Sequence, residues 1–260
     1  MNIEFAYADR NFKQSEGKIA ELNSLFTRGV EKTDKISLFS LRHSTAAFQI
    51  AVRSDEDCIL NVGGEPYFSQ RGQKPTSRIS LDTDLPASLH IIDFTVAEDG
   101  MRYADALLSS PVLELQAGEA RTIYAEISVP ADAAPGSHGF TVSFLTHRML
   151  EPERKAGSFS GTLEVSEYVM HDMKENKFHL DLWQHPSNLA RKAETPLWSD
   201  AHFTVIDRYL KSLGELGQKA VTVIASDAPW SGQGCGEVAD DANMFEYSII
   251  QAKKKRDGSR

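Results

Sequence analysis

The sequence predicts a mainly β protein: a two-sheet β-sandwich followed by the first β-α-β unit of an incomplete (β/α)8 barrel. Between about residues 35 and 169, short runs rich in Val, Ile, Phe, Thr and Leu alternate with Gly, Pro, Asp and Ser turns, which is an all-β signature. After residue 177, a strand-like run, an amphipathic segment and a Val/Ile run follow one another. That order is typical of a parallel β-α-β unit, whose strands are buried on both faces.

The β region divides into strands, and residues 120–129 show the pattern most clearly. Ile123, Ala125, Ile127 and Val129 alternate there with polar residues, as in a strand with one buried face. About seven such segments at this spacing favour a sandwich. The predicted strands are 36–41, 46–53, 78–81, 89–96, 120–129, 138–146 and 158–169.

Two domains are expected from this organisation. Residues 1–170 form the sandwich domain, and residues 177–260 form the start of a truncated TIM-barrel catalytic domain. The segment between them, about 168–176, is polar and has no clear period. Such a segment is typical of a connection between domains.

A helix is predicted from about residue 200 to 216. Ser199 can cap its N-terminus, and the Asp200 carboxylate in its first turn interacts favourably with the helix dipole. The apolar stripe of this helix consists of Phe203, Ile206, Leu210 and Leu213. Residues 18–28 also carry apolar side chains at helical spacing, so they form either a short amphipathic helix or a loop over the sheet edge.

The composition limits the partners and the compartment. A formal net charge of −9 argues against nucleic acid as a main partner, because phosphate binding relies on clustered Lys and Arg. The sequence has neither a secretory signal nor an apolar run of about 18 residues. We therefore expect no membrane association and a cytoplasmic location. Cys58 and Cys235 lie far apart in sequence, so we expect two reduced thiols.

Candidate substrate-binding residues follow the two strands of the predicted barrel unit. Trp183, Gln184 and His185 come after the first strand, and Asp227 and Trp230 end the second. Barrel enzymes build their sites at this end of the strands. An indole offers an apolar face to the C–H side of a pyranose, while Gln and His bond hydroxyl groups. The alternative is that Trp183 packs under the sandwich and His185 bonds a backbone carbonyl.

Other polar residues of this region point to structure rather than chemistry. Trp198 and His202 surround the predicted helix start, where a Trp is more often a packing anchor. His179 and His185 would lie about 20 Å apart in an extended strand, too far to share one ion at about 2.1 Å. Neither a metal nor a cofactor is expected, and no residue of the chain is assigned a catalytic role.

Three motifs in the last third resemble a family. They are FHLDLWQHP at 178–186, WSDAHF at 198–203 and APW at 228–230. In this order they resemble the barrel opening of the bacterial proteins called "domain of unknown function 4091", which are similar to glycoside hydrolase family 123. Residues 115–136 resemble the sandwich that precedes the barrel in certain bacterial glycoside hydrolases. The resemblance extends over about residues 35–258.

The resemblance implies a β-N-acetylhexosaminidase-like enzyme, specifically one similar to β-N-acetylgalactosaminidases, that uses substrate-assisted catalysis. The 2-acetamido group of the sugar attacks the anomeric carbon, so no enzyme nucleophile is needed. The family's adjacent Asp-Glu pair lies on a strand midway through the barrel, unlike the usual two separated carboxylates. No position in residues 1–260 corresponds to it, because Asp240 and Asp241 lie too early.

The resulting expectation is the N-terminal fragment of an intracellular glycoside hydrolase, inactive by itself. It would bind a carbohydrate substrate once the barrel is completed, and it could self-associate through uncovered strand edges. One alternative is a non-catalytic sandwich module that binds glycans or a protein. A glycan-binding sandwich should carry exposed aromatic residues on its own strands, whereas all three tryptophans lie outside it. A degenerate structural protein is the third possibility.

Overall fold

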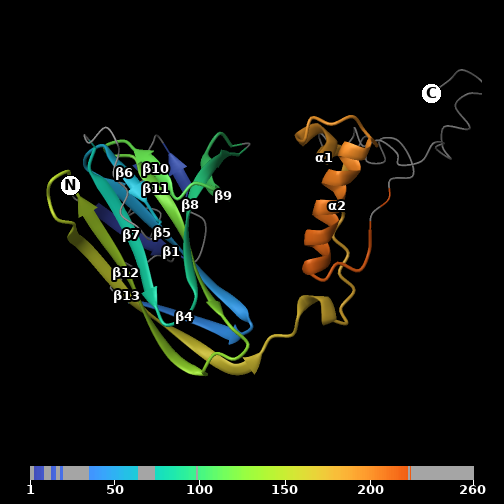
Figure 1. Ribbon diagram of the computed structural model, residues 1–260, viewed down its shortest axis with the longest axis horizontal. Coiled ribbons are helices and arrows are strands. Elements are labelled where there is room, and N and C mark those ends of the chain that lie inside the picture. Colours follow the sequence, from blue (N-terminus) through green and yellow to red (C-terminus); the bar gives the residue numbers. More distant parts are fainter. Residues whose placement is uncertain are drawn as a thin grey trace, which may run out of the picture. The chain divides into compact units, whose positions relative to one another are not determined.

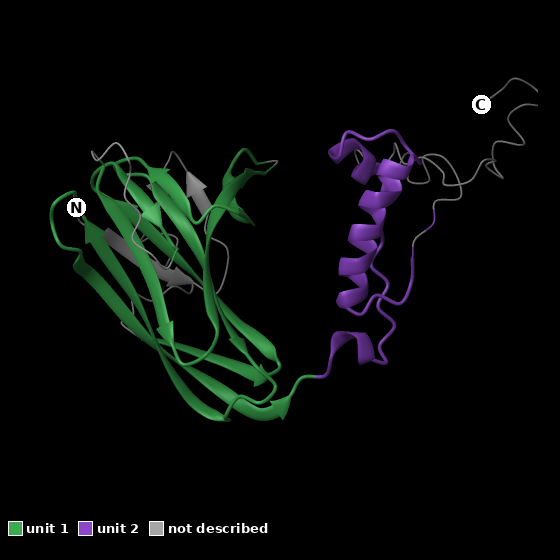
Figure 2. Ribbon diagram, in the orientation of Figure 1, with its two compact units in different colours: residues 1–170 green, residues 171–260 purple. Residues whose placement is uncertain are grey.

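The computed structural model describes residues 3–8, 13–15, 18–19, 35–63, 74–97, 99–221 and 223. The chain divides into two compact units, unit 1 at residues 1–170 and unit 2 at residues 171–260 (Figure 2). Unit 1 is built from β-strands, and the described part of unit 2 consists mainly of short helices (Figure 1). The predicted order, a β-rich region followed by a helical segment, is confirmed.

Two sheets make up unit 1 in the part of the chain that the structure describes. The first sheet has the strand order β1-β5-β11-β8-β9-β2-β3, and the second has the order β10-β6-β7-β12-β13-β4. The first contains β1 Ile3–Ala8, β2 Lys13–Ser15, β3 Lys18–Ile19, β5 Ser44–Ser54, β8 Ala87–Val96, β9 Arg102–Leu107 and β11 Ala120–Val129. The second contains β4 Lys35–Arg42, β6 Cys58–Asn61, β7 Thr76–Thr83, β10 Val112–Leu115, β12 Gly136–His147 and β13 Arg154–Val169.

The core lies between the inner faces of these two sheets. Phe48 of β5 stacks on Phe140 of β12 with ring centroids 5.4 Å apart, so side chains from both sheets meet there. In β11, Ile123, Ala125 and Ile127 are fully buried, which confirms the predicted inner face of this strand. Sheets packed in this way form a sandwich.

All seven predicted strands exist. They lie in β4, β5, β7, β8, β11, β12 and β13, and the bounds of β11 agree with the prediction. The prediction missed β1, β2, β3, β6, β9 and β10, which are only two to six residues long. Short strands carry too few residues for alternation to be recognised. The backbone of Lys18 and Ile19 forms β3, so a helix starting at residue 18 is wrong; residues 20–28 lie outside the described residues.

Unit 2 contains a 3-10 turn, η1 at Met173–Glu175, and two α-helices, α1 at Pro186–Lys192 and α2 at Asp200–Glu215. The predicted helix is thus confirmed, and its cap too, because Ser199 Oγ accepts a hydrogen bond from the His202 N–H at 3.2 Å. Helix α1 was not predicted. Within the described residues, no helix has the length and apolar character needed to span a bilayer.

The predicted apolar stripe of α2 is only partly covered. Ile206 is buried, but Phe203 is 48% exposed. Leu210 and Leu213 are half-buried. The helical spacing was therefore correct, whereas the extent of burial along the stripe was overestimated.

A histidine joins two turns of the sandwich. His138 Nδ1 lies 2.8 Å from Asp84 Oδ2, and His138 Nε2 lies 2.8 Å from the Ala134 carbonyl oxygen. The Ala134 carbonyl and then the Asp84 carboxylate raise the pKa of His138. In return, the hydrogen bond from His138 lowers the pKa of Asp84. A protonated imidazole can donate to both oxygens, so the contact is strongest when His138 is charged.

We expect the Asp84→Asn variant to lower the titration midpoint of His138. The raised pKa means that the histidine's stabilising effect is complete below about pH 6.5 and is lost as the pH rises through the folded pKa. The Asp84 effect is complete above about pH 4 and is lost as the pH falls through its lowered pKa. NMR titration of the imidazole ring measures the midpoint. Asp82→Asn removes the same charge nearby, and an equal shift in that control would contradict the specific contact.

Candidate functional site

Of the first predicted barrel strand, only Leu180 forms a β-bridge in the part of the chain that the structure describes, so residues 178–183 are not a continuous strand. Leu180 forms an isolated parallel bridge with Gln218, and the Lys219 N–H donates to the Leu180 carbonyl at 2.9 Å. The Gln218 side chain continues the pairing: its Oε1 accepts from the Leu182 N–H at 2.9 Å, and its Nε2 donates to the Leu182 carbonyl at 3.1 Å. The last backbone hydrogen bond that the structure describes between these two segments is at Leu180, and Leu182 is held by the Gln218 side chain. The parallel direction agrees with the predicted β-α-β order.

The three predicted site residues Trp183, Gln184 and His185, called the trio below, directly follow Leu182. The Trp183 side chain is 65% exposed, and Gln184 and His185 are half-buried. Gln184 Nε2 donates to the Leu182 carbonyl, so part of its amide is held by the end of the strand. His185 directly precedes α1 and occupies its N-cap position without a capping bond from its ring. An exposed indole therefore lies beside an amide and an imidazole.

The other two predicted site residues, Asp227 and Trp230, lie outside the described residues, so their meeting with the trio remains a prediction. Sequence reasoning missed Gln218, whose amide makes three hydrogen bonds to the backbone of Leu182 and Ala220. A glutamine just after Gly217 looks like an ordinary loop residue. Only the parallel bridge identifies it as the residue that holds the end of the strand.

His202, in the first turn of α2, joins this helix to the start of α1. Its side chain is fully buried, and its Nδ1 accepts a hydrogen bond from the Trp198 N–H at 2.9 Å. The proton of a neutral ring must then be on Nε2, which lies 2.9 Å from the Pro186 carbonyl oxygen and donates to it. The Trp198 ring centroid lies 5.0 Å from that of His202. The predicted packing role of Trp198 is confirmed.

This pairing fixes the start of α1. Pro186, the acceptor for His202, is the residue after His185, so the buried ring ties the trio to the N-terminus of α2. Trp198 reaches its position with a positive φ of 59°, a conformation that non-glycine residues adopt only when the surrounding contacts hold it. The helix start therefore acts as a rigid support for the trio.

The chemistry available to the trio is that of binding. An indole face, an amide and an imidazole recognise apolar C–H surfaces and hydroxyl groups. Among the described residues, no group of three or more His, Cys, Asp or Glu is arranged to hold a metal ion. Cys58 is a buried free thiol whose pKa is raised by burial. Cys235 lies outside the described residues.

Comparison with known proteins identifies the class: the chain is glycoside-hydrolase-like. The chain is similar to glycoside hydrolase family 123: the family model "Glycoside hydrolase 123, catalytic domain" matches residues 183–260. That match begins at Trp183. The structure of a family 123 glycoside hydrolase from Clostridium perfringens is similar with a TM-score of 0.60 and 16% identity, covering 94% of this chain. These findings confirm the resemblance, by sequence in the last third and by fold over most of the length.

The chain spans 41% of the length of that Clostridium perfringens structure. Two further solved structures are much less similar. A PapD-like domain of human CEP192 covers 52% of this chain at 12% identity with a TM-score of 0.29, the match extending over 83% of that domain. Spo0M from Bacillus subtilis covers 66% at 10% identity with a TM-score of 0.27, over 51% of its own chain. No curated protein sequence matches the chain.

Proposed function

We propose that this chain forms the sandwich and the opening of the barrel in a glycoside hydrolase that acts on 2-acetamido-2-deoxy sugars. In this proposal Trp183, Gln184 and His185 contact the saccharide, together with Asp227 and Trp230. Hydrolysis is substrate-assisted, and the Asp-Glu pair that the resemblance implies is absent from residues 1–260. We therefore expect the chain by itself to bind the sugar without cleaving it.

One observation carries the proposal: the family model begins at Trp183, the residue that directly follows the segment held by the Leu180 bridge and by the Gln218 bonds to Leu182. The carboxyl ends of parallel strands are where barrel enzymes place their substrates. The indole is exposed at this position, so its apolar face is accessible to the C–H side of a sugar. The His202 contacts with Trp198 and Pro186 hold the neighbouring backbone in place.

We expect Trp183→Ala to weaken saccharide binding by unit 2 by at least about fivefold, because stacking on an aromatic face contributes about 1 kcal/mol or more beyond the lost area. The measurement is tryptophan fluorescence during titration with methyl β-N-acetylgalactosaminide. All tryptophans of the chain lie in unit 2, so the signal reports on that unit alone. The wild-type chain should show a saturable change, and the variant, read from its two remaining tryptophans, should reach half-saturation at an at least about fivefold higher sugar concentration.

Tyr209→Ala supplies the matched control, because Tyr209 is a 55% exposed aromatic residue on α2, away from the strand end. It should bind the sugar as the wild type does. The proposal fails if the wild type gives no saturable change, or if Trp183→Ala and Tyr209→Ala have equal effects.

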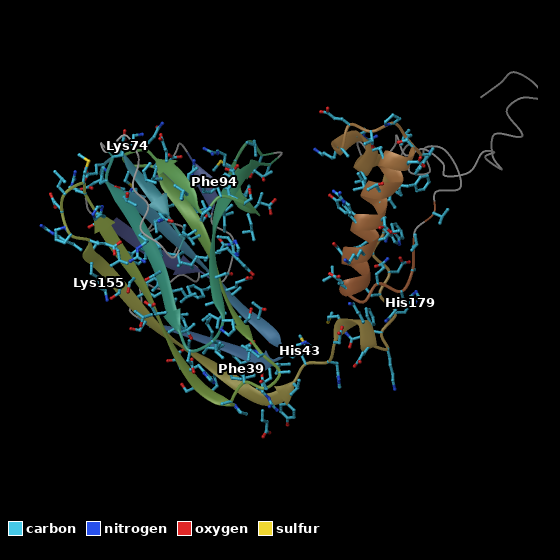
Figure 3. The ribbon with its side chains drawn as sticks, in the orientation of Figure 1. Phe39, His43, Lys74, Phe94, Lys155 and His179 are labelled. Carbon is cyan, nitrogen blue, oxygen red and sulfur yellow. The ribbon has the colours of Figure 1, made fainter. Side chains whose placement is uncertain are left out.

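A second candidate function is a non-catalytic glycan- or protein-binding sandwich, and one observation favours it. The three tryptophans lie outside unit 1, but two other aromatic residues on its strands are exposed. Phe39 on β4 (Figure 3) is 67% exposed, and Tyr168 near the end of β13 is 69% exposed. Replacing Phe39 and Tyr168 with Ser tests this second function. Lost retention of the chain on immobilised glycan would support it, and unchanged retention would contradict it.

A further inference from the structure

A cavity of about 590 Å³ opens in unit 1 between β7 and β8, two consecutive strands that belong to different sheets. Its walls are residues 79–82 of β7, residues 87–90 of β8 and the loop 108–111. The volume lies within the range of about 300–1,000 Å³ that is usual for small-molecule sites. All these residues belong to unit 1, so the cavity is separate from the trio at Trp183.

Both strand walls present backbone groups to the cavity. β6 pairs with β7 only as far as Arg78, and β9 pairs with β8 only from Ile92 onward. Among the described residues, 79–82 and 87–90 therefore have a strand neighbour on one side only. In an antiparallel strand, alternate residues turn their N–H and C=O groups toward each edge. The two walls thus offer both donors and acceptors.

The polar side chains of the cavity also offer hydrogen-bond donors and acceptors. Ser88 Oγ donates to Glu126 Oε1 at 2.8 Å, which uses the only proton of this hydroxyl. His90 Nε2, 3.1 Å from Ser88 Oγ, must then donate to it, leaving Nδ1 of the neutral ring as an acceptor. Among the described residues, neither Ser80 nor Ser109 has a hydrogen-bond partner for its hydroxyl, so each is available to a ligand.

The charges and the floor narrow the class of ligand. Arg78 is held by Glu153 in a bidentate pair at 2.8 and 2.7 Å, so its charge is compensated. Asp82 contributes an exposed carboxylate to the lining, which disfavours anions. The apolar floor consists of the half-buried Leu81 and Leu89 side chains. A ligand that matches this lining is neutral, rich in hydroxyl groups and apolar on one face.

We propose that this cavity is a second binding site, in the sandwich itself, for a neutral saccharide. The C–H face of the sugar lies over the apolar floor, and its hydroxyls bond the free strand edges, Ser80 and the His90 ring. Sugar hydroxyls both donate and accept, as the lining does. The inference does not rest on the proposed function of unit 2, because the two sites share no residue.

The test is NMR titration of the full 260-residue chain with N-acetylgalactosamine, galactose and glucose as separate probes. At least one sugar should cause saturable shifts of the amides at 79–82, 87–90 and 108–111. Ser80→Trp fills the cavity wall and should weaken this binding by at least about tenfold. Ser160→Trp introduces the same side chain on an exposed position of β13 outside the cavity, and it should bind as the wild type does.

His90→Ala provides a milder variant in case Ser80→Trp fails to fold, and it should weaken binding by about two- to tenfold, as expected for one hydrogen bond. Trp183→Ala should leave these amide shifts unchanged, so failure of one site is distinguishable from failure of the other. The proposal is overturned if no sugar gives saturable shifts, or if His90→Ala binds as tightly as the wild type. It is equally overturned if inorganic phosphate or an extended Val/Thr peptide gives these shifts and the sugars do not.

Discussion

Replacing Gly161 with alanine is expected to destabilise unit 1 by about 3 kcal/mol, the upper end for overpacking a core. A Cβ at this position of β13 would lie 2.1 Å from Phe140 Cζ and 2.5 Å from Phe140 Cε1. The Phe140 ring cannot move away freely, because it stacks on Phe48 of the opposite sheet at 5.4 Å. The added methyl group must therefore force the two sheets apart locally.

Gly139→Ala is the matched control for this prediction. Gly139 lies on the neighbouring strand β12, and a Cβ there meets no atom within 4 Å. Its free energy of unfolding, obtained from urea unfolding followed by circular dichroism, should stay within about 0.5 kcal/mol of the wild-type value. Phe140→Leu should recover part of the stability lost in Gly161→Ala, since the two side chains compete for one volume. Equal destabilisation by Gly161→Ala and Gly139→Ala would refute the steric explanation.

His202→Leu is expected to destabilise unit 2 by about 3 kcal/mol. Leucine has a similar volume but leaves the Trp198 N–H and the Pro186 carbonyl without their partner. Each buried group left unpaired costs about 1–3 kcal/mol. Because His202 joins the start of α2 to the start of α1, the amides of both helices should lose protection. Hydrogen exchange over residues 186–192 and 200–215 measures this loss.

Two further variants separate the hydrogen bonds from simple volume. His179→Leu makes the same chemical change at an exposed position and should leave protection unchanged. His202→Gln keeps one acceptor and one donor in the side chain, so it should retain more protection than His202→Leu. If His202→Leu leaves the exchange of α1 unchanged, the bridging role assigned to His202 is wrong.

Parts of the fold that depend on local pattern were predictable. The alternation in β11 identified its inner face because neighbouring side chains of a strand point to opposite faces, whatever the strand packs against. Helix α2 was predictable for a similar reason. Ser199 and Asp200 satisfy the first turn of the helix from within the same segment, so its start requires no distant partner.

The candidate site was predictable only in part. Trp183, Gln184 and His185 could be located because they follow a strand-like run, and family resemblance added the chemistry. The structure adds the supporting contacts of Gln218 and His202, which lie 36 residues from Leu182 and 16 residues from Pro186. A side chain that bonds a distant backbone group leaves no periodic signal in its own segment.

By itself, the sequence determined the class of the fold, the long strands, helix α2 and the position of the trio, since alternation, capping and motif order are local properties. The tertiary structure decided which strands pair. The parallel pairing of β4 with β13 brings together residues about 125 positions apart. Among the described residues, the cavity lies where β6 and β9 leave parts of β7 and β8 without neighbours. Pairing depends on the register and the burial of the whole chain, so it emerges only when the two sheets pack against each other.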